Sequence, residues 1–224
     1  MNTFTPPKVK VCGLTRLDDA LHAAAVGADY LGFILYPPSP RAVSPEVVKQ
    51  ITAYLRAAIP TPPLLIGVFV NEAAATIAYQ LDHLGLDLAQ LHGDEVPWMV
   101  GSPDSPLYGR CYKALRPLSL AEAEAEVEWY LPPDWQDGRP SLLIDAYHPT
   151  LRGGTGLAAD WGVVAQLAQN TPGLLLAGGL TPENVAEAVQ QVRPHGVDVA
   201  SGVEARPGVK DKEKVERFIT AAKR

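Results

Sequence analysis

Residues 141–156 read SLLIDAYHPTLRGGTG, and this stretch decides how the rest of the chain is interpreted. The apolar run 142–144 predicts a buried strand that ends at Asp145. The loop behind it contains three glycines, whose backbone N–H groups can approach an anion closely. Parallel α/β folds carry their chemistry at the carboxyl ends of the strands. The stretch therefore predicts a carboxyl group next to an anion-binding loop.

Seven other apolar runs rich in Val, Ile and Leu predict further strands, and helical patterns separate them. Such continuous apolarity is typical of parallel strands that are covered on both faces. Eight units in 224 residues leave 28 residues for each, close to the minimum of a strand–helix repeat. The predicted strands are 9–11, 30–35, 64–70, 86–91, 111–115, 142–144, 174–177 and 197–200.

This repeat predicts a (β/α)8 barrel with parallel strands, formed as a single domain by residues 1–224. A doubly wound open sheet is the rival arrangement. It is disfavoured because the chain lacks the Gly-x-Gly-x-x-Gly turn near its first strand. The connector 132–140 enters the sixth strand from the opposite end of the barrel, where loops serve stability, so we expect it to be structural.

The composition excludes several classes of function. A net charge of −6 without a Lys/Arg cluster argues against nucleic acid as a partner. No apolar run is long enough to cross a membrane, and the first residues do not resemble a signal peptide, so a cytoplasmic protein is expected. Two distant cysteines and five scattered histidines give no metal-ligand spacing. A small anionic molecule remains possible, and both a monomer and a homodimer stay open.

Alternation in the first strand places Lys10 and Cys12 on the face that looks into the barrel. Cys12 then ends the strand at the catalytic rim, and Lys10 lies one layer deeper. A buried lysine needs a partner, for which Asp198 on the adjoining eighth strand is the candidate. Since a nearby ammonium lowers the pKa of a thiol, we expect Cys12 to supply a thiolate base. Cys111, at the beginning of a strand, is expected to be a small buried hydrophobe.

Two polar residues follow other strands. Prolines between Tyr36 and Arg41 stiffen the backbone, so Arg41 is held at a defined place over the mouth, where a guanidinium suits a planar carboxylate. A solvated surface arginine is an equally good interpretation of the sequence alone. His92 ends the fourth strand on the same face as Gln90 and is expected to line the site, although a lone histidine is more often structural.

Three late turns offer backbone donors to an anion, and barrels often bind phosphate after strands seven and eight. Each turn alone could be only a tight connection. All three on one rim predict a phosphate site. Its expected residues are Gly154, Gly156, Gly178, Gly179, Ser201 and Gly202.

Taken together, these motifs resemble those of phosphoribosylanthranilate isomerase, and the resemblance covers nearly the whole chain. It rests on their order, with one motif after almost every strand. The matching segments are KVCGL at 10–14, GFILY at 32–36, SPR at 39–41, QLHGDE at 90–95, GGTG at 153–156, AGGLTPENV at 177–185 and VDVASGVE at 197–204.

The resemblance implies an Amadori rearrangement in tryptophan biosynthesis that needs no cofactor and acts on a small phosphorylated substrate. It assigns the base to Cys12, the acid to Asp145, the anthranilate carboxylate to Arg41 and the phosphate to the glycine turns. Asp198 matches an acidic site position without a settled role. The family usually has serine where this chain has Ala200, which removes one hydroxyl contact and puts phosphate affinity in doubt.

The residue types agree with this chemistry, with one tension. Free aspartic acid has a pKa of about 3.9 and free cysteine one of about 8.5, so both start mostly in the wrong state at neutral pH. Burial of Asp145 and positive neighbours of Cys12 would correct this. Two rivals remain: another phosphosugar barrel, such as an epimerase or a thiamin phosphate synthase, and a barrel that binds a phosphorylated metabolite without turnover.

Overall fold

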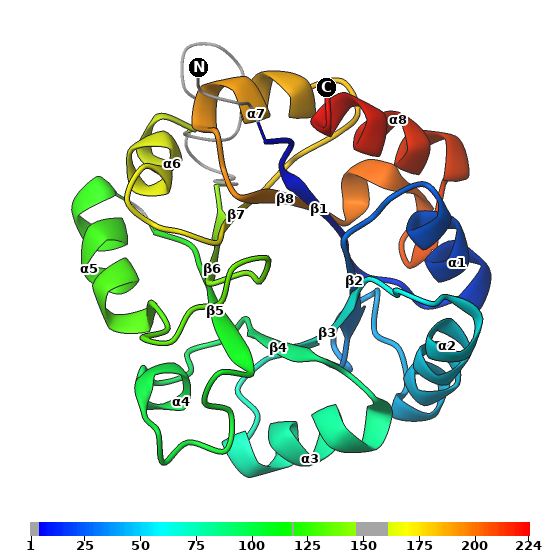
Figure 1. Cartoon of the computed structure of the whole chain (residues 1–224), viewed down its shortest axis with the longest axis horizontal. Coiled ribbons are helices and arrows are strands. Elements are labelled where there is room, and N and C mark those ends of the chain that lie inside the picture. Colours follow the sequence, from blue (N-terminus) through cyan, green and yellow to red (C-terminus); the bar gives the residue numbers. More distant parts are fainter. Residues whose placement is uncertain (1–4, 118, 147–160) are drawn as a thin grey trace.

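The structure is a computed structural model that describes residues 5–117, 119–146 and 161–224. Its parallel strands form one closed barrel in chain order, in which the last strand, β8, pairs with the first, β1 (Figure 1). The predicted (β/α)8 architecture is therefore confirmed. The barrel strands are β1 Lys8–Val11, β2 Tyr30–Ile34, β3 Leu64–Phe69, β4 Leu88–Leu91, β5 Cys111–Leu115, β6 Leu142–Asp145, β7 Leu174–Ala177 and β8 Gly196–Val199.

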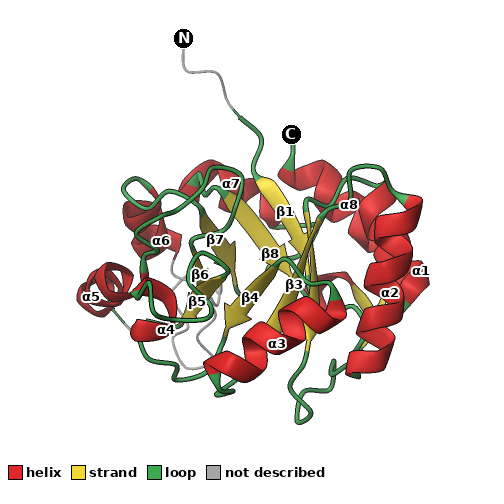
Figure 2. Ribbon diagram, turned by 60° about the horizontal axis from the view of Figure 1, so that its bottom comes forward, coloured by secondary structure: helices red, strands yellow, loops and turns green. Residues whose placement is uncertain are grey.

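Helices surround the strands on the outside, as a side view of the molecule shows (Figure 2). A short hairpin of β9 and β10 precedes the last helix. The helices are α1 Leu17–Ala25, α2 Pro45–Ala58, α3 Ala74–Leu84, α4 Trp98–Gly101, α5 Leu120–Tyr130, α6 Trp161–Ala168, α7 Val185–Val192 and α8 Lys212–Ala222. The hairpin strands are β9 Glu204–Arg206 and β10 Val209–Lys210, and the 3-10 turn η1 is Ser201–Val203.

Side chains on the two faces of the sheet belong to two different apolar clusters. This explains why most strands are continuously apolar in the sequence. Val9 and Val11 belong to the large cluster between strands and helices. Tyr112 and Leu143 belong to the small cluster that fills the barrel interior. Successive residues of a strand face opposite sides, so β2 to β7 contribute to both clusters, whereas β1 and β8 place Lys10 and Asp198 inside the barrel. Both faces are buried, and the polar residues that remain inside need partners there.

A turn precedes α7. Thr181 with Pro182 behind it is typical of a helix start, but α7 begins only at Val185. The side chain of Asn184 accepts a hydrogen bond from the N–H of Thr181 and donates one to the carbonyl of Gly179. These two bonds stabilise a turn before the helix. The local hydrogen bonds of the Asn side chain thus compete successfully with an earlier helix start.

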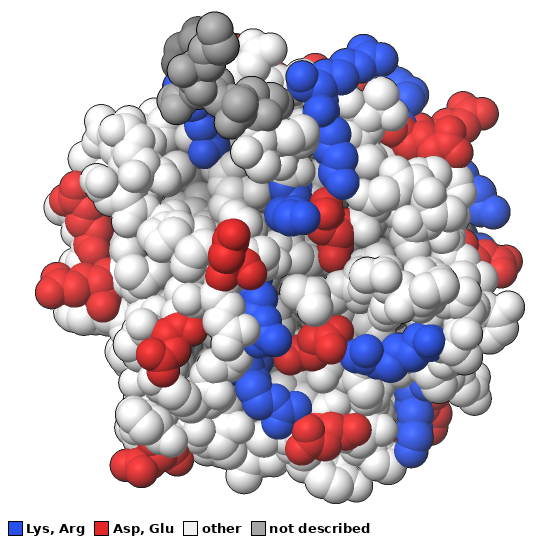
Figure 3. Space-filling view, viewed as in Figure 1, with Lys and Arg blue, Asp and Glu red and all other residues white. Residues whose placement is uncertain are grey.

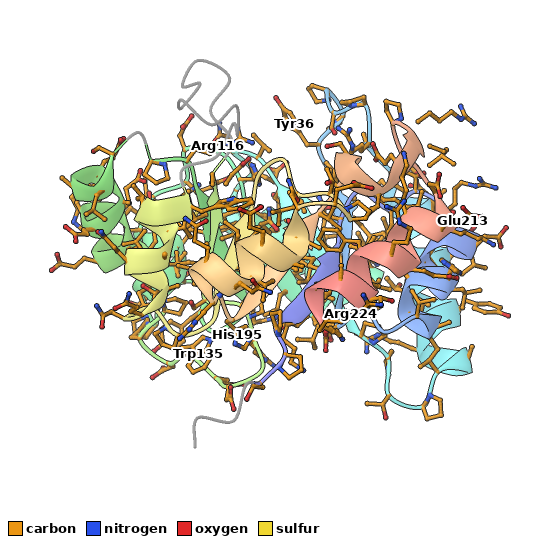
Figure 4. The ribbon with its side chains drawn as sticks, turned by 90° about the horizontal axis from the view of Figure 1, so that it is seen from above. Tyr36, Arg116, Trp135, His195, Glu213 and Arg224 are labelled. Carbon is orange, nitrogen blue, oxygen red and sulfur yellow. The ribbon has the colours of Figure 1, made fainter. Side chains whose placement is uncertain are left out.

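The two ends of the barrel differ in their residues (Figure 4). Tyr36 and Arg116, which follow β2 and β5, lie at one end, and Trp135 and His195 lie at the opposite end. Trp135 comes from the connector 132–140, and its indole N–H donates to the carbonyl of Arg139. The connector therefore lies where the sequence predicted it, at the end opposite to the carboxyl ends of the strands.

Candidate active site

A cavity of about 700 Å³ opens at the carboxyl end of the barrel. Its walls come from the carboxyl ends of the eight barrel strands and the residues that follow them. Of the predicted site residues, those that line it are Cys12, Arg41, His92, Asp145, Gly178, Gly179, Asp198, Ser201 and Gly202. Residues that lie on or follow all eight strands, far apart in the sequence, thus converge on one cavity. Gly154 and Gly156 lie outside the described residues.

Cys12 directly follows β1, and its backbone N–H donates to the carbonyl of Val199 on β8 at 2.8 Å. The side chain is almost fully buried. Its sulfur fits there because residue 32 is a glycine: a Cβ at Gly32 would lie 2.7 Å from the Cys12 sulfur. A larger residue on β2 would displace the thiol, since real Cβ atoms do not come so close. The glycine of the second strand therefore positions the candidate base.

Lys10 lies below Cys12, and its ammonium is 3.0 Å from a carboxylate oxygen of Asp198. The predicted partnership is confirmed. Burial opposes the charge, yet Asp198 and then Cys12 act to raise the pKa of Lys10, which ends above its usual value. Burial likewise raises the pKa of the Asp198 carboxyl, against the opposing effect of Lys10. Lysine and aspartate therefore form a buried charged pair directly under the thiol.

The expected direction for Cys12 was wrong. Burial raises the pKa of the Cys12 thiol above its ordinary value, although Lys10 acts to lower it and Lys210 contributes in the same sense. Removing a thiolate from water disfavours its charge more than the two ammonium groups favour it. The thiol is consequently the resting form. Any thiolate is formed next to Lys10, where the ammonium stabilises it.

Asp145 ends β6 as predicted, with part of its side chain open to the cavity. One carboxylate oxygen accepts a hydrogen bond from the Nε of Arg116 at 3.2 Å. The burial that was expected for this carboxyl is thus incomplete: its side chain is 20% exposed. Access from the cavity is what a proton donor to a substrate needs.

His92 connects the polar groups of the barrel interior to the cavity. Its Nδ1 lies 2.7 Å from the side-chain nitrogen of Gln90, and its Nε2 lies 2.6 Å from Arg116. Burial, then the charge of Arg116, lowers the pKa of His92 to about 3. The imidazole is therefore neutral near neutral pH.

Arg41 lies in the wall of the cavity, packed against Gly13. A Cβ at Gly13 would be 2.9 Å from the Arg41 side chain, and Gly13 adopts a positive φ of 73°. The Nε and Nη2 of Arg41 donate to the carboxylate of Glu204 at 2.9–3.1 Å. This edge of the guanidinium is therefore engaged by the protein. A ligand carboxylate would meet the edge formed by Nη1 and Nη2.

The turns after β7 and β8 contact each other through their backbones. Gly178 and Gly179 both have a positive φ, 99° and 64°, which favours glycine. A Cβ at Gly202 would lie 1.9 Å from the carbonyl oxygen of Leu180. No side chain fits between the two turns, so glycine at 202 permits their close contact. Together with Ser201 these turns bring backbone groups to one side of the cavity.

Four site residues were not assigned a role from the sequence. Gln90 and Arg116 lie against the two ring nitrogens of His92. Glu204 and Lys210 form a buried pair with an N–O distance of 3.2 Å, and Glu204 also contacts Arg41. Arg116 directly follows β5, so the rule that function gathers at carboxyl ends of strands could have found it. Lys210 lies in a hairpin whose return to the barrel had no signal in the sequence.

The described part of the chain contains no group of three or more His, Cys, Asp or Glu residues that could hold a metal ion. No helix within the described ranges has the length and apolarity to cross a membrane. On the face in Figure 3, acidic and basic side chains are interspersed. Such a face lacks the basic stripe that nucleic acid requires.

Comparison with known proteins gives one family. Residues 9–221 match the family model described as N-(5′-phosphoribosyl)anthranilate isomerase. The isomerase of that name from Pelobacter propionicus is 42% identical over 218 residues, which cover 96% of this chain and 95% of the relative.

Two solved structures resemble the chain with a TM-score of 0.77 and 33% identity, covering 97% of this chain and 98% of theirs. One shows monomers of the dimeric phosphoribosylanthranilate isomerase from Thermotoga maritima. The other is the isomerase in complex with reduced 1-(o-carboxyphenylamino)-1-deoxyribulose 5-phosphate. Fold, motif order and full-length similarity agree, and the chain belongs to the N-(5′-phosphoribosyl)anthranilate isomerase family.

Proposed function

We propose that this chain converts N-(5′-phosphoribosyl)anthranilate to 1-(2-carboxyphenylamino)-1-deoxyribulose 5-phosphate, with Cys12 as the general base and Asp145 as the general acid. Family membership gives the reaction class, an aldose–ketose isomerisation in tryptophan biosynthesis. The observation that supports the two roles is that the thiol from β1 and the carboxyl from β6 line the same cavity. Two groups on different sides of one substrate can act on different atoms of it.

Asp145 acts first in this proposal. It donates a proton to the ribose ring oxygen, and the bond from C1′ to that oxygen breaks. The lone pair of the anthranilate nitrogen forms the C1′=N bond of a Schiff base. Arg116 donates to one oxygen of the same carboxyl group in the structure, so its side chain lies beside the sugar that reaches Asp145.

Cys12 acts next, as a thiolate. It removes the proton from C2′, and the electron pair of that C–H bond forms the C1′=C2′ bond of an enolamine, while the C=N electrons return to nitrogen. Transfer of a proton from the 2′-hydroxyl to C1′ then gives the ketone. The ammonium of Lys10 acts to lower the pKa of the thiol and so offsets part of the effect of burial.

The remaining predicted residues bind different groups of the substrate. Arg41 binds the anthranilate carboxylate through its Nη1 and Nη2 edge, opposite to the edge that Glu204 holds. The turns at Gly178 and Gly202 bind the phosphate through backbone N–H groups. Gly154 and Gly156 are proposed to complete this phosphate site.

Asp198 is proposed to bind a substrate hydroxyl. Its Oδ2 is held by Lys10, whereas its Oδ1 is buried without a hydrogen-bond partner among the described residues. Asp198 lines the cavity, and a hydrogen bond from a substrate hydroxyl would satisfy that oxygen. The proposal also places the enzyme in the cytoplasm, as a monomer or a homodimer. The relative from Thermotoga maritima is described as dimeric.

The decisive test mixes the purified chain with phosphoribosylanthranilate and follows the loss of anthranilate fluorescence. We expect turnover, and at least about 10²-fold slower turnover for Asp145→Asn with product still bound. Absence of turnover by the wild-type chain would refute the function. Near-normal turnover by Asp145→Asn would refute the acid assignment alone. Arg41→Met, which removes the carboxylate contact, should raise KM more than it lowers kcat.

A further inference from the structure

The polar groups inside the barrel, below the cavity, form a chain of contacts that ends at His92. The carboxylate of Asp198 holds Lys10, Lys10 contacts Gln90, and Gln90 contacts His92. Lys10, Gln90 and Tyr112 are essentially inaccessible to solvent. Buried polar groups of this kind have few ways to satisfy their hydrogen bonds, so each contact restricts the next.

Lysine determines which way the Gln90 amide points. The Lys10 Nζ lies 2.6 Å from the side-chain oxygen of Gln90, and the Tyr112 hydroxyl lies 2.9 Å from the same atom. An ammonium group has three N–H donors and no acceptor, so the amide atom that faces it has to be the oxygen. The NH₂ group of Gln90 is therefore the part that faces His92.

The amide in turn determines the tautomer of His92. An amide NH₂ group only donates, and it lies 2.7 Å from Nδ1. Nδ1 therefore accepts this hydrogen bond and carries no proton. A neutral imidazole then has its proton on Nε2, the nitrogen that faces the cavity side and Arg116.

Arg116 meets this nitrogen with another donor. Its Nη2 lies 2.6 Å from Nε2 of His92, and a guanidinium has no acceptor. Two donors gain nothing from each other, so this contact is not a stabilising hydrogen bond. Both are available to a single acceptor oxygen, and Arg116 also contacts the candidate acid Asp145. The acceptor they share thus belongs to the part of the substrate on which Asp145 acts.

We propose that Lys10 and Gln90 are positioning residues that keep His92 in the Nε2-protonated tautomer, so that this N–H donates to a ribose oxygen of the substrate. The inference rests on the proposed function for its substrate. The phosphate turns belong to β7 and β8 and Arg41 follows β2, so the end of β4 faces the sugar between them. In this arrangement Asp198 acts on the substrate both directly and through the chain of contacts.

The tautomer is tested without any substrate. Nitrogen-15 NMR of the histidine side chains, with the His92 signals identified by their loss in His92→Gln, should show Nε2 protonated and Nδ1 unprotonated in the free protein. Gln90→Glu presents only acceptors to Nδ1, so a proton should appear on Nδ1. Protonation of Nδ1 in the wild-type chain, or an unchanged pattern in Gln90→Glu, would overturn the proposed relay.

The donation is tested by kinetics. His92→Leu removes the donor and should lower kcat/KM about tenfold, the loss expected for one hydrogen bond to an uncharged oxygen. His92→Gln places an amide N–H near the position of Nε2 and should recover most of that loss. His83→Leu, on the exposed surface of α3, is the matched control and should equal wild type.

The possible outcomes separate the two proposals. If the wild-type chain does not turn over phosphoribosylanthranilate, the proposed function fails while the NMR result still stands. If the wild-type chain is active and His92→Leu equals it, only the inference fails. An equal loss in His92→Leu and His92→Gln would show that shape, not the N–H, is what the site requires, and would also overturn it.

Discussion

Two buried lysines, Lys10 on β1 and Lys113 on β5, look alike in the sequence but serve different regions of the molecule. Lys10 points into the barrel, where it binds Asp198 and Gln90. Lys113 lies on the outer face of its strand, where it pairs with Glu95 at 3.1 Å. Both pairs are almost inaccessible to solvent. Burial of an ion pair therefore does not by itself distinguish a site from a scaffold.

The difference lies in how the remaining hydrogen bonds are used. Lys113 also donates to three backbone carbonyls, those of Leu91, Gly93 and Ala114, and its ammonium lies 5.8 Å from the ring centre of Tyr130. The hydrogen bonds of the Lys113 ammonium are therefore all made within the protein. The partners of Lys10 line the cavity, and Asp198 keeps one oxygen without a partner among the described residues. A buried cluster that keeps an unused hydrogen-bond acceptor beside a cavity is the one to associate with substrate binding or catalysis.

The largest expected effect is on stability, at the outer lysine. Lys113→Met leaves the Glu95 carboxylate buried without its cation and should lower the free energy of unfolding by about 3–5 kcal/mol. The double variant Lys113→Met with Glu95→Gln removes both charges and should recover much of this loss. Urea unfolding measures both, and kcat at 25 °C should stay near wild type wherever the variants are folded. A selective loss of kcat in folded Lys113→Met would make the outer cluster functional and break the comparison.

Next comes the contrast between the two cysteines. Cys12→Ala should lower kcat at least about 10²-fold, because the alanine cannot take the C2′ proton. Cys111→Ala is the matched control, since its sulfur faces Met99 outside the barrel and burial raises its pKa to about 12. Its kcat should change less than about threefold. The fluorescence assay compares them, and equal activity of Cys12→Ala and wild type would remove Cys12 from the mechanism.

A smaller effect concerns pH. As the proposed base, Cys12 has to act as a thiolate, and burial raises the pKa of its thiol above the ordinary value. The thiolate fraction therefore increases as pH rises toward that pKa, by up to about tenfold per pH unit below it. We expect the ultraviolet thiolate absorbance of Cys12, measured as wild type minus Cys12→Ala, to be small at neutral pH and to increase as the pH becomes alkaline. A Cys12 thiolate signal that is already complete at neutral pH would contradict a thiol with a raised pKa as the base.

The same profile sharpens the comparison of the lysines. Lys10→Met removes the charge that opposes the effect of burial, so the rise should move to still higher pH. The variant also leaves Asp198 unpaired, so its folding has to be checked by circular dichroism. Lys113→Met should leave the position of the rise unchanged, because its cation does not contribute to the pKa of Cys12.

The smallest expected effect is a gain. Ala200 lines the cavity beside the phosphate turns, and its carbonyl accepts from Lys210 at 2.9 Å. Ala200→Ser adds the hydroxyl that the family usually has there and should lower KM a few-fold, the worth of one hydrogen bond. kcat should not change. A KM equal to that of wild type would show that backbone groups alone hold the phosphate.

Much of the molecule was predictable because its signals are local. Apolar runs with turns between them gave the strands, and the alternation around Cys12 placed Lys10 in the interior and suggested Asp198 as its partner. The direction of the pKa of Cys12 was not predictable. It depends on how completely the thiol is buried, and this follows from residues on other strands, such as Gly32. The pairing of Arg41 with Glu204 likewise requires the folded hairpin after β8.

The contact between Gly202 and the carbonyl of Leu180 also affects how this scaffold can change. Because the two turns touch backbone to backbone, neither can be lengthened or given a side chain at that point without moving the other. In laboratory selection for new substrates, every accepted substrate should therefore still carry the phosphate group. Variation should accumulate across the mouth, at the ends of β2, β4 and β5, where side chains and not main chain form the wall.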